Sequence, residues 1–432
     1  GSARAQPFWE RLSVTMRRAT RSHLCRALAT LALATVALSL AGARAFALGH
    51  IRTQPNNLRS SSTWAFGCTG QHLLRSTPRS SSPVTAAAVA VVAAAALIIQ
   101  KNGGHRAEIG YHLALKLRQQ GLSVTLLGDS AHQLGRLPSM YCQLEDTGVD
   151  VLWADLAHQS ALEEAARGSF DFIFSDEDCP EGVQRTCRPC QPRLYVHLGN
   201  AAVYAPAGDA ELLEDSTKEA SSPSFTAERR VASADGLPWC IVRPQHMYSQ
   251  LGSDCLDYFF DRLVRGLPVP LPVDGCQRTR LTHVEDVAAL LARITELPAE
   301  HLIGEAFNCA SSSRVSHLKL LADVGACLGM DREAAKARAV FYPEGCVTAP
   351  AGAAGFPFRE VHCGVGVKKA KEQLQWRPAK RLDQTFLSEY LAEYRRQGRH
   401  RRPLDTRFDE AVFSALGQRL ETAVGQEQVV AA

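Results

Sequence analysis

The residues with the clearest chemical meaning are three glycines that follow a short apolar run. Residues 96–99 are apolar, Gly103 and Gly104 come shortly after them, and Gly110 lies within a helical pattern of apolar residues. Glycines between a strand and a helix let the chain turn tightly and bring its backbone amides close to a phosphate. This spacing therefore predicts a loop that binds the pyrophosphate of a dinucleotide.

Two carboxylates follow the next two β-like runs. Asp129 comes about 20 residues after the glycines, where a carboxylate can bind a ribose, and Asp155 follows VLWA, where it could face an adenine. In the spacing G-x-x-G-x-x-G the middle position is Ala107, whose methyl group lies where the backbone should approach the pyrophosphate. We therefore expect NAD or NADP to bind weakly or in a purely structural role. The alternative is that these residues only form turns in a cofactor-free core.

The elements that must position these residues alternate between β-like and helical runs. This alternation predicts an α/β fold with a Rossmann-type, doubly wound parallel sheet. The expected strands span 96–100, 123–127, 149–153, 170–175, 193–198 and 239–243. A helix is expected over 284–295, and a helical tail predicts a smaller C-terminal, substrate-side domain at the carboxyl edge of the sheet. The expected divisions are a leader over 1–83, a Rossmann domain over 84–250, a C-terminal part over 251–403 and a C-terminal helix and tail over 404–432.

Four further motifs resemble those of the extended short-chain dehydrogenases. They are LYVHLGNAAVY (194–204), WCIVRPQHMY (239–248), LTHVEDVA (281–288) and EAFNCA (305–310). Within that family the chain is similar to the atypical chloroplast stem-loop-binding proteins. The likeness spans about 96–418 and is weakest over 129–235. It is carried by NGGHRAEIG, DCLDYFFDRLVRGLPVPLP (254–272), FPFREVHCGVGVKKAKEQLQW (356–376) and the basic tail.

The resemblance implies an NAD(P)-binding-like scaffold and a plastid protein that binds structured RNA. It also implies that the protein could act as an endoribonuclease or an RNA-stability factor, with a divalent metal if it cuts RNA. Implied partners are structured RNA, plastid ribosomes, a second copy or a paralogue, and thylakoid or photosynthetic complexes. Two alternatives stay open: an NAD(P)-dependent epimerase/dehydratase-like oxidoreductase, and a cofactor-bound structural subunit of a plastid complex.

The residues that the family uses for hydride chemistry are replaced in this chain. The catalytic serine position holds Gly199 or Asn200. The Tyr-x-x-x-Lys positions fall on Ala220 and Ser224, or on Phe225 and Arg229, depending on the register. Without a phenol held near deprotonation by a lysine there is no proton relay, so oxidoreductase activity is disfavoured. For the motif His283-x-x-Asp286 we expect a strand end and a helix cap rather than a catalytic couple.

A strongly basic segment near the C-terminus provides candidate RNA contacts. Residues 368–402 hold 11 Lys and Arg against 4 acidic residues, a net charge of +7. Such a segment can gather phosphates on one face, although composition alone equally fits a solvated helical face. The resemblance favours RNA. The candidate contacts are Lys368, Lys369, Lys371, Arg395, Arg396, Arg399, Arg401 and Arg402.

The first 82 residues have the composition of a targeting leader. They hold 11 Arg, no Lys and one acidic residue. A basic start precedes the apolar stretch 27–40, a small-x-small site at 43–45, Phe46 and a Ser/Arg-rich tract. A signal peptide followed by a transit peptide predicts the plastid stroma of an alga with a secondary plastid; ordinary secretion is the alternative. The apolar run 84–99 should end as the first sheet strand, and a thylakoid anchor is its alternative.

The cysteines indicate a reducing compartment. Thirteen Cys are scattered without framework spacing, and the one tight cluster is Cys179, Cys187 and Cys190. This cluster lacks a second C-x-x-C or a nearby His pair, so we expect a solvated loop rather than a zinc site.

Overall fold

The described part of the chain begins just before the first sheet strand. The computed structural model describes residues 93–418 except 102, 131–137, 157, 159–162, 164–167 and 177–189. These residues belong to one structural unit, which starts at Ala88. The predicted signal and transit peptides, residues 84–92, Cys179 and Cys187 lie outside the described residues.

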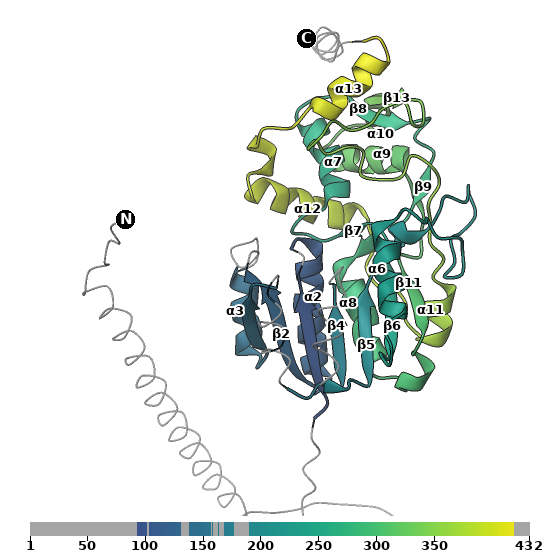
Figure 1. The fold of residues 1–432 in the computed structure, drawn as a ribbon. Helices are drawn as coiled ribbons and strands as arrows, with labels where there is room; N and C mark the ends of the chain where they lie inside the picture. The colour runs from purple at the N-terminus through teal and green to yellow at the C-terminus, as the bar shows by residue number, and fades with distance from the viewer. Residues whose placement is uncertain are drawn as a thin grey trace, which may run out of the picture. The chain divides into compact units, whose positions relative to one another are not determined.

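Seven parallel strands form the central sheet (Figure 1). Their order is β11-β6-β5-β4-β1-β2-β3, and every neighbouring pair is parallel. The strands are β1 (Ala95–Gln100), β2 (Ser123–Asp129), β3 (Asp150–Ala154), β4 (Phe172–Ser175), β5 (Leu194–Leu198), β6 (Trp239–Pro244) and β11 (Glu305–Cys309). The six predicted strands and the doubly wound parallel sheet are confirmed. The apolar run that ends at Ile99 does become the first strand.

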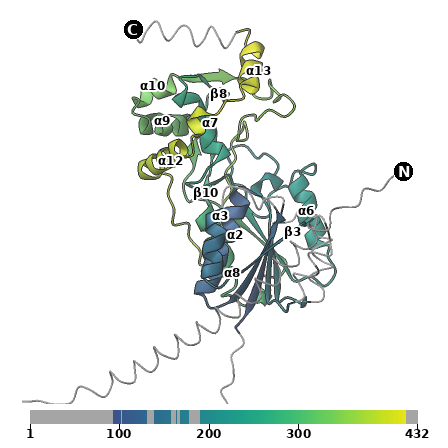
Figure 2. The ribbon, with the colours of Figure 1, turned by 90° about the vertical axis from the view of Figure 1, so that its left-hand side faces the viewer.

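Both faces of the sheet are covered, which explains why its strands are apolar throughout. In β1, Ala96 and Ile98 pack into one core, whereas Leu97 and Ile99 pack into the core on the opposite face. Figure 2 shows the first face covered by three helices and the opposite face by α6. These helices are α2 (His105–Gln119), α3 (Pro138–Asp146), α8 (Val284–Ile294) and α6 (Pro223–Ala232).

A second, smaller core lies beyond the carboxyl ends of the strands (Figure 1). Aromatic residues dominate it, among them Phe259, Phe260 and Tyr390. Its elements are α7 (Asp254–Val264), β8 (Val269–Pro272), α9 (His317–Cys327), α10 (Arg332–Lys336), β13 (Ala339–Tyr342), α12 (Gln384–Arg396) and α13 (Arg407–Ala415). The smaller C-terminal part expected at this edge is thus present.

The chain passes between the two cores more than once. The expected division at residue 250 therefore does not assign each core to one continuous segment. The segment from Val284 to Ala310 returns to the sheet core, as does the segment from Cys363 to Trp376. Short pairs of strands link the passages. The remaining elements are β7 (Met247–Tyr248), β9 (Arg278–Thr279), β10 (Thr282–His283), β12 (Val315–Ser316), α11 (Lys368–Gln373), η2 (Ala201–Val203), η3 (Ala299–His301) and η4 (Arg399–Arg401).

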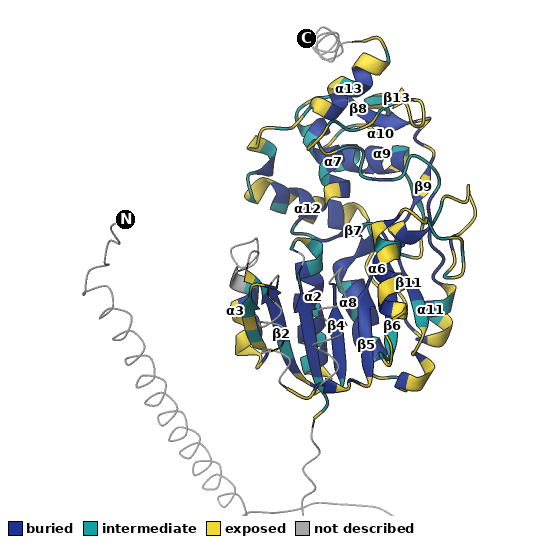
Figure 3. Cartoon of the chain, in the orientation of Figure 1, coloured by how far each residue is buried: buried dark blue, intermediate teal, exposed yellow. Residues whose placement is uncertain are grey.

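The burial pattern follows these layers (Figure 3). The central strands are almost wholly buried, and the exposed residues lie on the outer helix faces and in loops. The predicted helix over 284–295 is confirmed as α8. No helix in the described part of the chain has the length and apolar character needed to cross a membrane.

Gly110 lets α2 pack closely against β1. A Cβ atom at this position would lie 1.8 Å from Gln100 Oε1, inside any contact distance. The Gln100 side chain is held in place because it is buried and its Nε2 donates to the Tyr141 hydroxyl at 2.7 Å. The glycine is therefore required by packing between helix and strand.

We predict that Gly110→Ala lowers the free energy of unfolding by about 1–3 kcal/mol, the usual cost of overpacking a filled core. Urea denaturation of Gly110→Ala, Gln100→Ala and the double variant forms a mutant cycle. Because Gln100→Ala removes the colliding atom, the double variant should lose less stability than the sum of the two single changes. If the loss of stability in the double variant equals the sum of the losses in the two single variants, the Gln100 side chain is not the reason why glycine is required.

Candidate functional site

The carboxyl ends of parallel strands meet at one edge of a sheet, and the predicted dinucleotide residues follow these ends. Gly103 and Gly104 come after β1, Asp129 ends β2, and Asp155 follows β3. β1, β2 and β3 are adjacent in the sheet. The structure therefore brings these four residues to the same edge, whereas Gly110 lies farther along α2 in the packing role described above.

Gly104 makes the turn into α2. Its φ of 65° and ψ of −134° suit glycine, and it is the N-cap of the helix without a side-chain hydrogen bond. Backbone amides in the first turn of a helix are a suitable place for an anion. Ala107, at the middle position of the glycine spacing, is buried within this first turn.

Two charged side chains of the first turn also lie at this edge, and sequence analysis did not assign them a role. Arg106 crosses to the end of β5, where Nη1 donates to Leu198 O at 2.8 Å and Nη2 to Gly199 O at 3.4 Å. Glu108 is 4% exposed and lies 3.6 Å from His105 Nδ1. In the sequence, the only sign that Arg106 and Glu108 could matter is that these two charged residues follow the glycines closely.

The space beside the loop is small while Arg106 holds this position. A cavity of about 20 Å³ lies between α2 and the sheet, with Arg106 and Asp176 among its lining residues. Such a volume has room for about one water molecule. Asp176, which follows β4, is buried, and its Oδ1 accepts a hydrogen bond from Lys101 N at 2.7 Å.

The two ribose and adenine candidates differ in environment. Asp129 is half-buried at the end of β2. Asp155 is more exposed, with 55% of its side chain accessible, and lies 3.5 Å from His158 Nε2.

Cys190, the one described member of the cysteine cluster, is buried beside Gly168 O, and burial raises the pKa of its thiol.

A buried ion pair explains why a serine is absent near the end of β5. Arg243 Nη2 lies 2.8 Å from Glu228 Oε2, and both side chains are almost fully buried. A Cβ atom at Gly199 would lie 2.8 Å from Glu228 Oε1. Asn200, the other candidate for the serine position, is a helix cap whose Oδ1 accepts from Ala202 N at 2.8 Å. Neither position holds a hydroxyl.

The fold does bring one tyrosine and one lysine together, but not as a proton relay. Lys218 Nζ lies 4.7 Å from the centre of the Tyr204 ring and donates to Glu214 O at 2.9 Å. The Tyr204 hydroxyl donates to Asn308 Oδ1 at 2.6 Å and accepts from Arg243 Nη1 at 2.8 Å. Burial raises the pKa of Tyr204 to about 12. This phenol is a structural hydrogen-bonding group, not an acid poised near neutrality.

His283 ends β10 and caps α8, as predicted, whereas Asp286 binds the backbone of a distant segment instead of capping the helix. His283 Nδ1 accepts from Glu285 N at 3.2 Å and so caps α8. The carboxylate of Asp286 accepts from Ala379 N at 2.9 Å and from Lys380 N at 3.1 Å. Asp286 thus ties the segment before α12 to the sheet side of the molecule.

The basic segment divides into surface cations and buried ones. Lys368, Arg395, Arg396, Arg401 and Arg402 are exposed, whereas Lys369 and Lys371 are half-buried. Lys369 forms an ion pair with Glu305.

For Arg399 the prediction of an exposed RNA contact is wrong. Arg399 is 4% exposed, its Nη1 lies 2.7 Å from Asp257 Oδ1, and its guanidinium stacks on Tyr390 and Tyr394. Burial between two aromatic rings removes this charge from the surface.

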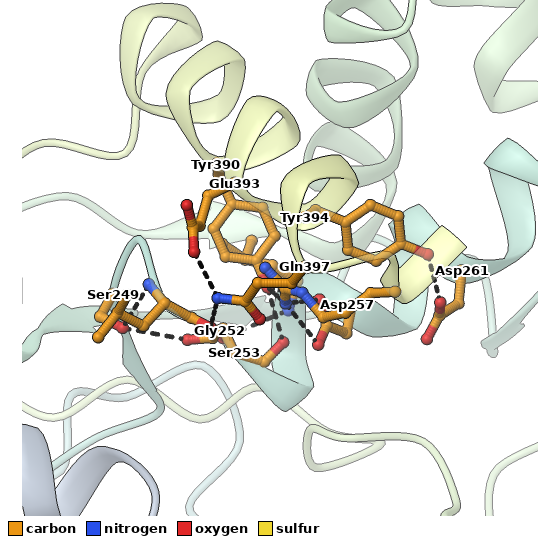
Figure 4. A network of polar contacts seen from close by, with 12 residues as sticks. Ser249, Gly252, Ser253, Asp257, Asp261, Tyr390, Glu393, Tyr394 and Gln397 are labelled. Atoms are coloured by element: carbon orange, nitrogen blue, oxygen red, sulfur yellow. Dashed lines mark hydrogen bonds and ion pairs between the residues drawn. The ribbon is translucent and has the colours of Figure 1, made fainter. Parts of the chain in front are cut away.

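Figure 4 shows the network that fastens α12 to α7. Tyr390 donates to Asp257 Oδ1 at 2.5 Å, and Tyr394 donates to Asp261. Gln397 Nε2 donates to Leu251 O at 3.2 Å. The helix that carries Arg395 and Arg396 is therefore held rigidly.

Comparison with known proteins identifies the scaffold. Residues 103–310 match the NAD dependent epimerase/dehydratase family. This match and the Rossmann-type fold agree with the resemblance to extended short-chain dehydrogenases that the sequence motifs indicated.

Individual relatives agree with this assignment. The chain is 26% identical over 338 residues to the "Chloroplast stem-loop binding protein of 41 kDa b, chloroplastic" of Arabidopsis thaliana, covering 72% of this chain and 83% of that protein. It also resembles dTDP-glucose 4,6-dehydratase from Bacillus anthracis in complex with NAD, at a TM-score of 0.56 and 14% identity, covering 71% of this chain and 98% of that one. UDP-glucuronic acid 4-epimerase from Bacillus cereus in complex with NAD gives a TM-score of 0.53 and 16% identity, covering 70% of this chain and 96% of that one. At these identities the solved structures support the fold alone.

Buried histidines make this fold sensitive to acid. Burial lowers the pKa of His197 and of His317 to about 3, and that of His283 to about 4. Each side chain is 1% exposed, and neither ring nitrogen of His317 has a hydrogen-bond partner among the described residues. His317 stacks on Phe358, and His246 and His362 add to the lowering of its pKa.

We predict that the protein loses stability as the pH falls below 6.5. The folded state keeps these imidazoles neutral while the unfolded chain binds protons, so the stabilisation is complete above the ordinary pKa of 6.5 and is lost toward the folded values. Each histidine contributes a slope of about 1.4 kcal/mol per pH unit in that window. His317→Phe should reduce the dependence of the unfolding free energy on pH by about that amount. Urea denaturation at a series of pH values between 4.5 and 7.5 measures it. The exposed His301→Phe is the control, and equal slopes in both variants would contradict the prediction.

Proposed function

We propose that this protein binds structured RNA through a cationic surface at both ends of α12. The surface comprises Arg377, Lys380 and Arg381 before the helix and Arg395, Arg396, Arg401 and Arg402 at and beyond its end, all of them exposed. Among the described residues, ion pairs are formed by the neighbouring Lys380, Arg396 and Arg399. None is formed by Arg377, Arg381 or Arg395. The rigid display of these cations is the observation that carries the proposal.

The comparison with a named stem-loop binding protein supports the choice of RNA over other polyanions. That relative is a chloroplast protein by name, and the composition of the leader of this chain agrees with a plastid protein. We therefore propose the plastid as the compartment. The proposal concerns RNA binding, and the endoribonuclease activity that the resemblance implies stays a prediction.

The hydride chemistry of the family is not part of the proposal. The buried pair Glu228–Arg243 fills the space beside Gly199, and Tyr204 is held as a structural phenol. No described residue pair near the end of β5 offers the tyrosine and lysine geometry that hydride transfer needs. A scaffold that keeps its sheet but uses its outer surface fits these observations best.

The test is the salt dependence of RNA binding. We predict that Arg395→Ala/Arg401→Ala flattens the slope of log affinity against log salt by about 1.4–1.8 if each arginine neutralises one phosphate. The control is Arg229→Ala/Arg230→Ala, which removes two exposed arginines of α6 on the sheet. Its slope should equal that of the wild type, and Arg399 is left intact because it is buried.

Folded stems should bind more tightly than their scrambled sequences, because the surface reads phosphate geometry rather than bases. The melting temperature of the α12 variant should barely change, since both arginines are exposed. An unchanged slope in the α12 variant would move the RNA site elsewhere. A wild-type protein without affinity for RNA at low salt would overturn the proposal.

A second proposed function is weak or structural binding of a nicotinamide dinucleotide. The residues fit the adenosine half: the turn at Gly103 and Gly104 would hold the pyrophosphate, and Asp129 would hold the ribose. Arg106 and the buried Glu108 fit less well, because one fills the space beside the loop and the other repels an anion. When bound, the dinucleotide could supply hydride chemistry, but it would lack the tyrosine relay.

Calorimetry with NAD and NADP checks this second proposal. We expect a weak binding heat that Asp129→Ala abolishes and that the exposed Asp146→Ala leaves unchanged. Because the readout is heat of binding, it does not depend on any turnover. Steady conversion of a nucleotide sugar would contradict the conclusion that the catalytic pair is absent.

A further inference from the structure

A second cavity lies away from the dinucleotide loop. It has a volume of about 520 Å³ and opens between three segments that are far apart in the sequence. These are the loop 311–315 after β11, the first turns of α9, and residues 378–383 before α12. None of its lining residues belongs to the loop after β1 or to the carboxylates that follow β2 and β3. Its volume is within the range of small-molecule sites.

Cations and hydroxyl groups occupy one part of the cavity wall. Arg314, Lys319, Lys380 and Arg381 line it together with the serines 311–313. Its two carboxylates are already engaged. Asp323 pairs with Lys319 and Arg332, and Asp383 accepts from Phe386 N at 3.0 Å as the N-cap of α12.

The cations differ in how far they are committed to protein partners. Arg314 pairs with Asp209 at 3.2 Å, and Lys380 pairs with Glu285 at 3.0 Å. Arg381 is exposed and has no hydrogen bond or ion pair with any residue that the structure describes. A guanidinium in the lining of a cavity that three serines also line suits the oxygens of a phosphate.

Apolar side chains form the rest of the wall. They are Leu281, Val315, Pro378 and Leu382. A bare phosphate makes no use of such a surface, whereas a flat, weakly polar ring attached to a phosphate would cover it. The combination of cations, hydroxyls and an apolar wall therefore indicates a ligand of nucleotide size.

The walls are held in place before any ligand arrives. Arg280 Nη1 donates to Ser311 O at 2.6 Å, which fixes the loop after β11. Asp286 holds the segment before α12 through the amides of Ala379 and Lys380. Such preorganisation lowers the ordering cost of binding.

We propose that this cavity binds one nucleoside monophosphate unit, with the phosphate at Arg381 and the serines 311–313 and the base against the apolar wall. The unit is either a free nucleotide or one nucleotide of a bound RNA. Lys380 and Arg381 belong both to this cavity and to the proposed RNA surface. Arg395 and Arg401, which the RNA test changes, do not line the cavity, so the two proposals can fail separately.

The test titrates the full chain with AMP, with inorganic phosphate and with a stem-loop RNA. Arg381→Ala should weaken AMP binding at least tenfold, whereas the exposed Arg229→Ala of α6, which removes an equal charge outside the cavity and outside the proposed RNA surface, should leave it unchanged. Ser312→Trp, on the exposed loop, should weaken AMP binding by filling the cavity without removing a cation. Circular dichroism and thermal melting establish that each variant is folded.

Each outcome decides a point. Competition between AMP and RNA would identify an RNA nucleotide as the occupant, and AMP binding without competition would identify a free nucleotide; both support the proposal. Phosphate binding as tight as AMP binding would overturn it, because the apolar wall would then contribute nothing. Equal AMP affinity in Arg381→Ala and wild type would also overturn it. RNA binding that depends on Arg395 and Arg401 while AMP fails to bind would leave the proposed function standing alone.

Discussion

The buried pair between Arg243 and Glu228 sets the arrangement at the centre of the molecule. It joins β6 to α6, and Arg243 also donates to the Tyr204 hydroxyl, which in turn donates to Asn308 of β11. Burying a charge costs free energy unless an opposite charge lies beside it. Loss of either side chain would therefore leave the other as an unpaired buried charge. A side chain at Gly199 would collide with Glu228. Restoring a serine there would therefore require moving the ion pair first.

Asp286 has a comparable role between the two cores. Its carboxylate binds the backbone of the segment 379–380, which precedes α12 and lines the 520 Å³ cavity. Both the cationic surface and the cavity thus depend on a residue of α8, in the sheet core. The motif His283-x-x-Asp286 begins α8, and its Asp286 also holds the backbone of the distant segment 379–380 in place.

The sequence predicted the sheet well because its strands are apolar on both faces and are separated by glycine turns. All six expected strands and α8 are present, and Gly104, Asp129 and Asp155 lie at or after the ends of β1, β2 and β3, where their role in binding a dinucleotide stays a prediction. The positions of charged side chains could not be predicted in the same way. Arg399 lies in a run of arginines that reads as a polar tail, yet a carboxylate from α7 and two aromatic rings bury it.

The same limit applies to Arg106, Glu228 and the cavity. Each depends on a contact between segments separated by tens of residues, such as the reach of Arg106 to Leu198 O. Local periodicity carries no information about such contacts. Gly199 could be seen as a departure from a serine, but the reason for the departure is visible only once Glu228 is placed.

Buried and exposed electrostatic interactions lie side by side along α12 and the short helix η4 that follows it. The contacts of Arg399 with Asp257 and Tyr390 are buried, and dissolved ions screen buried pairs far less than exposed ones. Arg395 and Arg401 face solvent, where screening is strong. Concentrated salt should therefore weaken any contact of a polyanion with the exposed arginines while leaving α12 docked on α7, so a wash at high salt would not unfold the protein.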